Sequence, residues 1–467
     1  MTPTFAAALL AQAVSLVLLR HRLGRRWLHR PVTLFMLAST VDLGIAPALL
    51  RIPSVAADDT FEIGIKRSFI DSADLMMSLV MLGFTIAYLL ARPERTVTMT
   101  RPGDALVVAR VLDWRILAVA CLNMAVVTAA GRGYNDGTAA GAGTPVETDL
   151  VSTFFIIVIA AASVAFVMRH GSRWFLPVLV VQSILLALAG ERTPVLMDAL
   201  ALTIVLPFVG IRPSRRQLAI AALLAVATVY AITGVRSEQG RMIFYSNSGL
   251  MSRVTALGDG LVGGGSPGED SGLPGFAAQF ATREAGVDFA GAILQSISEG
   301  QPRLSPSYVG ESLLLNVPSF LWTSKLDRSL ALNPAQLQIN DFGLQQINFI
   351  PSMVGMYVGM LSPPELLALF GLLGLAFGWF ERRLLRECTP ARVILLIGAI
   401  DSALWYEAGL PVVLVQMRAA IALAAIAKVA EMMIYGRISW SRQRWTPASA
   451  RQNSTATFNI KGNEGIN

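Results

Sequence analysis

Long apolar runs recur along this 467-residue chain, and they constrain its fold more than any other feature of the sequence. Each run is close to the roughly 20 residues that a helix needs to cross a hydrocarbon core of about 30 Å. Only 15% of the residues are charged, against 54% that are hydrophobic, which is too little charge to cover a soluble domain of this length. We therefore predict an all-α fold: a polytopic integral membrane helical bundle of about 11 transmembrane helices with one large external loop.

The predicted spans form two groups on either side of a long polar interval. The N-terminal group lies within residues 1–235 and comprises Met1–Leu19, Pro31–Leu50, Ser72–Ala91, Ile116–Ala130, Leu150–Met168, Trp174–Ala189, Pro194–Ile211 and Gln217–Val235. The C-terminal group lies within residues 349–435 and comprises Glu365–Phe380, Val393–Tyr406 and Val412–Tyr435. Before it stands Ile347–Leu361, which is apolar but short and broken by Gly and Pro, as in a re-entrant or interfacial segment. Residues 436–467 are predicted to form a disordered cytoplasmic tail.

Basic residues determine the predicted orientation. If the N-terminus lies outside, most basic residues between the spans fall on the inner side, beginning with the stretch Arg20–Arg30. This distribution follows the positive-inside rule and places the C-terminus in the cytoplasm. It also explains the net charge of +7 better than a nucleic-acid partner does.

Histidine and cysteine give no sign of a metal centre. His21, His29 and His170 all fall on the inner side of the predicted topology, and Cys121 and Cys388 lie far apart in sequence. No Walker, Rossmann, kinase or zinc pattern is present. We therefore predict no metal site and no cofactor.

The polar interval, residues 236–348, is too long to be a simple connector. Gly258–Gly275 reads as a linker or mobile flap, and Phe276–Ser298 has apolar residues at helical spacing. The segments that follow, Tyr308–Ser324 and Asn333–Asn348, are rich in amides and aromatic residues. Because rings stack on sugars and amides bond hydroxyl groups, Tyr308, Trp322 and Asn348 become candidate sugar-binding residues.

Arginines at the outer ends of the spans are candidate phosphate ligands, because the planar guanidinium donates two parallel hydrogen bonds to such an anion. Arg192 lies in a tight link between two spans, and Arg236 and Arg241 follow the eighth span. Arg418 lies within the last span, where an unpaired charge costs several kcal/mol. The alternative is that Arg192 and Arg241 only reach the interface, and that Arg418 pairs with Glu407 or Asp401.

Carboxylates of the loop are candidates for accepting a proton from a sugar hydroxyl. The acidic residues considered are Glu284, Asp288, Glu299, Glu311 and Asp341. We select Glu311 as the candidate catalytic carboxylate. A solvated surface position or a salt bridge is the alternative interpretation for each of these residues.

Four segments resemble the Wzy-type oligosaccharide repeat-unit polymerases, also called O-antigen polymerases. Leu186–Leu200 is similar to the family's helix–Gly-x-Arg–helix hairpin, and Ile232–Arg241 to its Arg-bearing exit into the external loop. Ser307–Asp327 is similar to a loop segment with Pro, Trp and Lys, although Ser319 stands where the family often has Arg. Ile347–Leu385 is similar to the Gly-spaced segment that returns to the membrane.

The resemblance implies a glycosyltransferase of the bacterial cytoplasmic membrane. Such an enzyme moves a growing glycan from one undecaprenyl diphosphate to the terminal sugar of a fresh lipid-linked repeat unit. Its partners would be the lipid-linked oligosaccharide, membrane lipids, a flippase and a chain-length regulator. The carried-over diphosphate contacts are Arg192, Arg236, Arg241 and Arg418. Trp322 and Lys325 would lie near the glycan.

Three alternatives remain open. An O-antigen ligase has a similar layout but is associated with a loop histidine, and this loop has none. A lipid-linked glycan flippase or other transporter would be expected to have paired halves with broken helices, and no such symmetry is visible. A structural subunit without chemistry would not need the outer arginines.

Overall fold

Helices make up all the regular structure in the part of the chain that the structure, a computed structural model, describes. The described residues are 2–52, 65–91, 146–188, 192–209, 211–238, 250–262, 286–314, 317, 334–344, 352–386, 389–406 and 409–444. No strand occurs among them, so the all-α prediction is confirmed for these residues.

The helices keep the order of the two predicted groups. The first helices are α1 (Pro3–Leu23), η1 (Gly24–His29), α2 (Pro31–Thr40), η2 (Val41–Ile45), α3 (Ala46–Leu49), α4 (Arg67–Leu90), α7 (Val146–His170), η3 (Ser172–Trp174), α8 (Phe175–Leu188), α9 (Arg192–Phe208) and α10 (Arg215–Glu238). The next are α12 (Leu250–Val262), α14 (Val287–Ser298), α15 (Ser307–Leu314), α17 (Pro334–Asp341) and η4 (Gly355–Tyr357). The last are α18 (Pro363–Leu384), α19 (Pro390–Leu404) and α20 (Leu410–Arg444).

Five helical stretches are long and apolar enough to cross a membrane. They are Pro3–Leu23, Pro31–Leu49, Arg67–Leu90, Pro363–Leu384 and Leu410–Met433. Shorter apolar helices accompany them, for example Ile156–His170. A membrane-embedded helical protein is therefore supported. The prediction of about 11 spans is not decided by this finding, and the predicted span Ile116–Ala130 lies outside the described residues.

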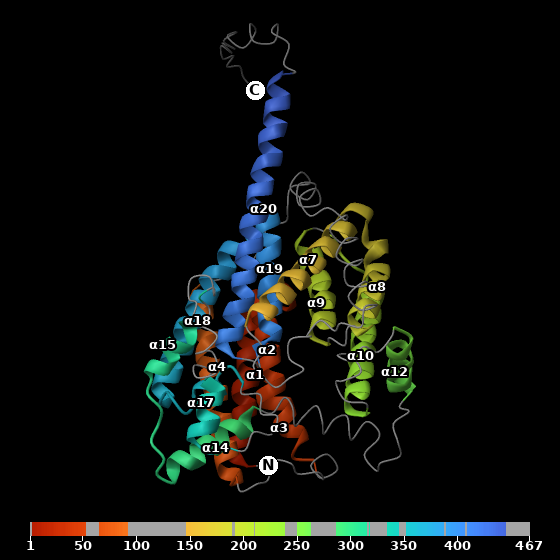
Figure 1. Cartoon of the computed structure of the whole chain (residues 1–467). Coiled ribbons are helices and arrows are strands. Elements are labelled where there is room, and N and C mark those ends of the chain that lie inside the picture. Colours follow the sequence, from red (N-terminus) through yellow and green to blue (C-terminus); the bar gives the residue numbers. More distant parts are fainter. Residues whose placement is uncertain are drawn as a thin grey trace, which may run out of the picture.

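The bundle has distinct ends (Figure 1). The N-terminus and the loop helices, by which we mean α14, α15 and α17, lie at one end of the bundle, and the C-terminal end of α20 lies at the other. Two hydrophobic cores hold the helices together. The first joins α1, α2, α4, α18 and the loop helices, and the second joins α7 to α10 with α19 and α20.

Some boundaries differ from the predicted ones. Helix α12 runs to Val262, so the first residues of the predicted flap Gly258–Gly275 are helical, and the rest lie outside the described residues. Helix α20 continues to Arg444, so the predicted tail begins as helix. Of the predicted loop helix Phe276–Ser298, the described part is α14.

The segment Ser352–Leu361 is buried and irregular rather than a spanning helix. Its regular part is the short 3₁₀ turn η4. The Arg303 guanidinium donates to the carbonyls of Val358 and Leu361 at 2.6 and 2.9 Å. Irregular backbone at membrane depth needs such internal partners. Burial lowers the pKa of Arg303 below its usual range, against the opposing effect of the Glu365 carboxylate.

Gln338 of α17 holds the same segment from a second side. Its amide nitrogen donates to the Met356 carbonyl at 2.6 Å, and its amide oxygen accepts from the Gly359 N–H at 2.7 Å. One buried side chain thus satisfies a donor and an acceptor of the irregular backbone.

Close backbone approach between α4 and α18 gives the first prediction. A methyl group at Gly374 would lie 2.3 Å from the Phe84 carbonyl oxygen, whereas a methyl group at Gly371 would meet nothing within 4 Å. We expect Gly374→Ala to lower the free energy of unfolding by about 1–3 kcal/mol through overpacking. The control Gly371→Ala, on the same helix, should be neutral or slightly stabilising. Denaturation of the two purified variants in one detergent checks this; equal midpoints would contradict it.

The orientation gives the second prediction. A reporter fused after Gly265 is expected on the outer side of the membrane and one fused after Gln443 in the cytoplasm, because basic residues concentrate on the inner side. A pair of enzymes, one active only outside and one only inside, gives opposite readings at each position. Equal readings at both positions would reject the topology.

Candidate functional site

A π-helical turn interrupts the second membrane-length helix and carries an acidic residue. Val41–Ile45 forms the turn, and the Ala46 N–H donates to the Val41 carbonyl, one residue further back than in an α-helix. Pro47 follows and has no N–H to donate, so the α-helical pattern cannot close there. The turn holds Asp42 inside the bundle, where it is 2% exposed.

Asp42 joins the loop to the membrane helices. Its Oδ1 accepts a hydrogen bond from the Gly286 N–H, at the start of α14, at 2.9 Å. A methyl group at Gly286 would lie 2.7 Å from the Ser352 nitrogen, so only glycine permits this approach. Tyr406, at the end of α19, lies within electrostatic range of Asp42. We call Asp42, Gly286, Ser352 and Tyr406 the Asp42 junction.

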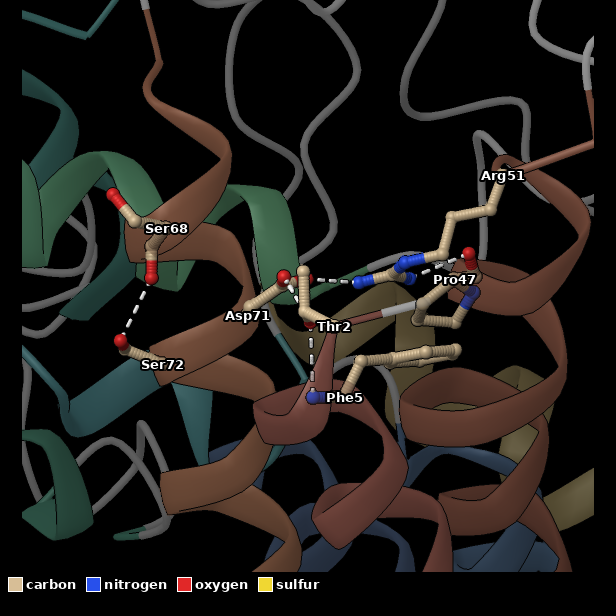
Figure 2. Close-up of polar contacts among 7 residues, drawn as sticks. All are labelled: Thr2, Phe5, Pro47, Arg51, Ser68, Asp71 and Ser72. Atoms are coloured by element: carbon tan, nitrogen blue, oxygen red, sulfur yellow. Dashed lines mark hydrogen bonds and ion pairs between the residues drawn. The ribbon is translucent and has the colours of Figure 1, made fainter.

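A second polar group surrounds Arg51, which follows the end of α3 (Figure 2). Arg51 forms an ion pair with Asp71 of α4, donates to the Pro47 carbonyl at 2.7 Å and stacks 3.4 Å above the Phe5 ring. The Thr2 hydroxyl donates to the other Asp71 oxygen at 2.5 Å. The pair ties the start of α1 and the end of α3 to α4.

An apolar groove of about 380 Å³ runs between α1 and the interrupted helix α2–η2–α3. Leu9 and Leu16 form one wall, and Ile45 and Leu49 form the other. Its lining ends at Ile52, next in sequence to Arg51. The groove is thus an apolar surface, and the charged group of Arg51 and Asp71 lies beside the residue at its end rather than in its lining.

Two of the predicted site residues lie on the short helix α15. Tyr308 packs against the first core, and Glu311 is half-buried with no ion pair among the described residues. Helix α15 contacts α20, which carries half-buried Arg418. The fold thus brings the elements of Glu311 and Arg418 into contact.

The alternative in which Arg418 pairs with Asp401 finds no support. Among the described residues, no ion pair joins Arg418 to the buried Asp401 carboxylate. Glu407, the other partner considered, lies outside those residues.

Convergence of the arginines stays a prediction. Arg192 begins α9 and Arg236 lies near the end of α10, but only their backbones belong to the described structure. The other predicted residues lie outside the described ranges: Arg241, Trp322, Lys325 and Asn348.

Sequence reasoning missed two buried carboxylates, Asp42 and Asp74, and considered Asp401 only as a partner of Arg418. All three lie inside apolar runs that are predicted to be spans. An acidic residue within a span is a functional-site signal by itself, the same signal that singled out Arg418. That signal could have found Asp42 and Asp74.

Within the described residues, no group of three or more His, Cys, Asp or Glu residues could hold a metal ion. The polar groups described above are carboxylates, guanidinium groups and hydroxyls. Guanidinium groups bind anions, carboxylates bind protons, and carboxylates and hydroxyls can bond to sugar hydroxyls. Comparison with known proteins adds no relative to this description, since no family model, no curated protein and no solved structure matches the chain.

Proposed function

We propose that the chain is a membrane glycosyltransferase that polymerises oligosaccharide repeat units linked to undecaprenyl diphosphate. The reaction would take place at the outer face of the bacterial cytoplasmic membrane. One observation carries the proposal: an apolar groove of about 380 Å³ ends at Ile52, next in sequence to the ion-paired Arg51, and the loop helices lie at the same end of the bundle as the N-terminus.

A lipid-linked sugar needs both parts of this arrangement. Its isoprenoid chain would lie against the apolar groove, where burial of hydrocarbon is favourable, and its diphosphate would stay at the membrane surface. The glycan would extend toward the loop helices. Gly44 in the groove wall has no side chain, and a methyl group there would lie 3.5 Å from the Leu9 side chain across the groove.

The chemical step is glycosyl transfer without a cofactor. The oxygen of an acceptor sugar hydroxyl bonds to the anomeric carbon of the donor glycan. As this bond forms, the hydroxyl loses its proton to a carboxylate, for which we propose Glu311. The bond from that carbon to the diphosphate breaks, and the electron pair leaves with the diphosphate. Arg192, Arg236, Arg241 and Arg418 would stabilise the negative charge that develops there.

The finer topology belongs to the same proposal. About 11 spans with the N-terminus outside would put the loop helices on the outer side, where a flippase delivers the substrate. A chain-length regulator would act on the product on that side. Because the N-terminus and the loop helices share one end of the bundle, an N-terminus outside would place the loop helices outside as well.

The test is reconstitution of the purified chain in nanodiscs with a synthetic lipid-linked repeat unit. A ladder of lipid-linked products supports the proposal. Transfer only to an added lipid A-core acceptor identifies a ligase instead. Movement of the lipid-linked substrate across a proteoliposome membrane without a new glycosidic bond identifies a flippase. No product and no movement rejects all three.

A further inference from the structure

Asp74 is a carboxylate in an unusual position. It lies on α4, a helix of membrane-spanning length, and its side chain is fully buried. Neither carboxylate oxygen has a hydrogen-bond partner among the described residues. The Ser78 hydroxyl, one turn further along α4, accepts a hydrogen bond from the Gln12 amide nitrogen at 3.2 Å. An ionised carboxylate without donors costs several kcal/mol in such surroundings.

The charged groups that face Asp74 do not supply a counter-charge for it. They are Arg51 beyond α3, Asp71 on α4 itself and Asp288 on α14. Arg51 is already ion-paired with Asp71. The faces of α1 and α18 that pack on α4 add no charged group to this set. Among the described residues, Arg51 is therefore the cation that acts on Asp74, and it is shared with Asp71.

A proton fits this place and a metal ion does not. No described group of acidic, His or Cys residues has the geometry to hold a metal. Helices α4 and α14 also approach closely, since a methyl group at Gly291 would lie 3.0 Å from the Ile70 Cα. At the end of the contact, the Lys66 N–H donates to the Gln295 amide oxygen at 2.7 Å.

We propose that Asp74 is a proton-binding site at the contact between α4 and α14, and that its protonation keeps α14 seated on α4. The protonated carboxyl is neutral and tolerates Asp288 nearby. When the proton leaves for water, the ionised Asp74 carboxylate is buried without a hydrogen-bond donor among the described residues, and separation of α14 from α4 lets water reach it. Because α14 begins next to the Asp42 junction, the loop would respond to external pH.

The proton itself is tested with a hydrophobic carbodiimide, which forms a stable adduct with a protonated carboxyl group in apolar surroundings. The full chain in nanodiscs is treated from about pH 5 to about pH 9, and the modified peptides are found by mass spectrometry. We expect modification of Asp74 that falls about tenfold for each pH unit once the proton begins to leave. Ion-paired Asp71 is the internal control and should stay unmodified. Absence of the Asp74 adduct at every pH overturns the proposal.

The seating of α14 is tested by the distance between two spin labels. The labels are placed at exposed Ser72 of α4 and exposed Glu299 at the end of α14, after both native cysteines are replaced by serine. We expect one short distance at low pH and a second, longer population at high pH. Asp74→Asn, which is neutral at every pH, should keep the short distance throughout. A wild-type distance that does not change with pH overturns the proposal, whether or not the chain proves to be a glycosyltransferase.

Discussion

Replacement of Glu381 by alanine is expected to lower the free energy of unfolding by about 3–5 kcal/mol. Glu381 of α18 and Arg30 are both fully buried, and their side chains meet at 3.1 Å. The Tyr88 hydroxyl of α4 donates to the same carboxylate at 2.9 Å. The substitution would leave the Arg30 guanidinium buried without this counter-charge. Chemical denaturation of the purified variant in detergent, followed by circular dichroism, measures the loss.

Two controls separate the ion pair from its surroundings. The double variant Arg30→Met, Glu381→Leu removes both charges and should recover most of the lost stability, because apolar replacements of a buried pair are often neutral. Lys428→Ala breaks a pair in which the lysine is exposed and Glu431 is buried, and solvent screening at Lys428 should make the loss of stability smaller than in Glu381→Ala. A Glu381→Ala variant as stable as Lys428→Ala would show that the buried pair is not needed.

The membrane-length helices could be predicted because their signals are local. Apolar composition predicted the span Ser72–Ala91, and the structure has a helix at Arg67–Leu90. A proline stands at the start of the helical stretch Pro31–Leu49. The start of α18 has a capping box between Ser362 and Glu365, a pattern formed by residues three positions apart in sequence. Each of these depends on a few neighbouring positions, so the sequence alone is sufficient.

The buried pair could not be predicted because it depends on a contact between distant parts of the chain. Arg30 closes a basic stretch that the positive-inside rule explains as an interfacial anchor, and Glu381 stands beside Arg382 and Arg383. Nothing local says that Arg30 and Glu381 meet in the core. The irregular segment is similar: its short, broken apolar composition excluded a span, but its support by Arg303 and Gln338 comes from tertiary structure.

The candidate site could be predicted from the sequence only in part. Placement of a charge within an apolar run identified Arg418, and the same reasoning applies to Asp42 and Asp74. What the charges contact is a different question, because Asp42 meets Gly286 across a sequence separation of 244 residues. A charge within an apolar run can be found in the sequence, but the group that it contacts is known only from the fold.

Substitution of Arg418 is expected to have the largest effect on activity. Arg418 lies eight residues, or about 12 Å, along α20 from Leu410. Its side chain is half-buried, and α20 packs against α19. If it contacts the leaving diphosphate, its interaction strengthens as the glycosyl bond breaks. Loss of one such donor costs about 2.7–4 kcal/mol, so Arg418→Ala should lower the rate of chain extension about 10²–10³-fold. The reconstituted polymerisation assay measures this rate.

Two further variants, Arg418→Lys and Lys428→Ala, serve as controls for Arg418→Ala. Arg418→Lys keeps the charge but loses the planar fork of donors, so it should recover little of the rate. Lys428→Ala, ten residues further along α20, removes a surface charge and should leave the rate near that of the unchanged chain. Arg192→Ala should behave like Arg418→Ala. Chain extension near the normal rate in both alanine variants, at equal membrane levels, would exclude these arginines from the site, because an arginine that contacts developing charge cannot be removed without slowing the step.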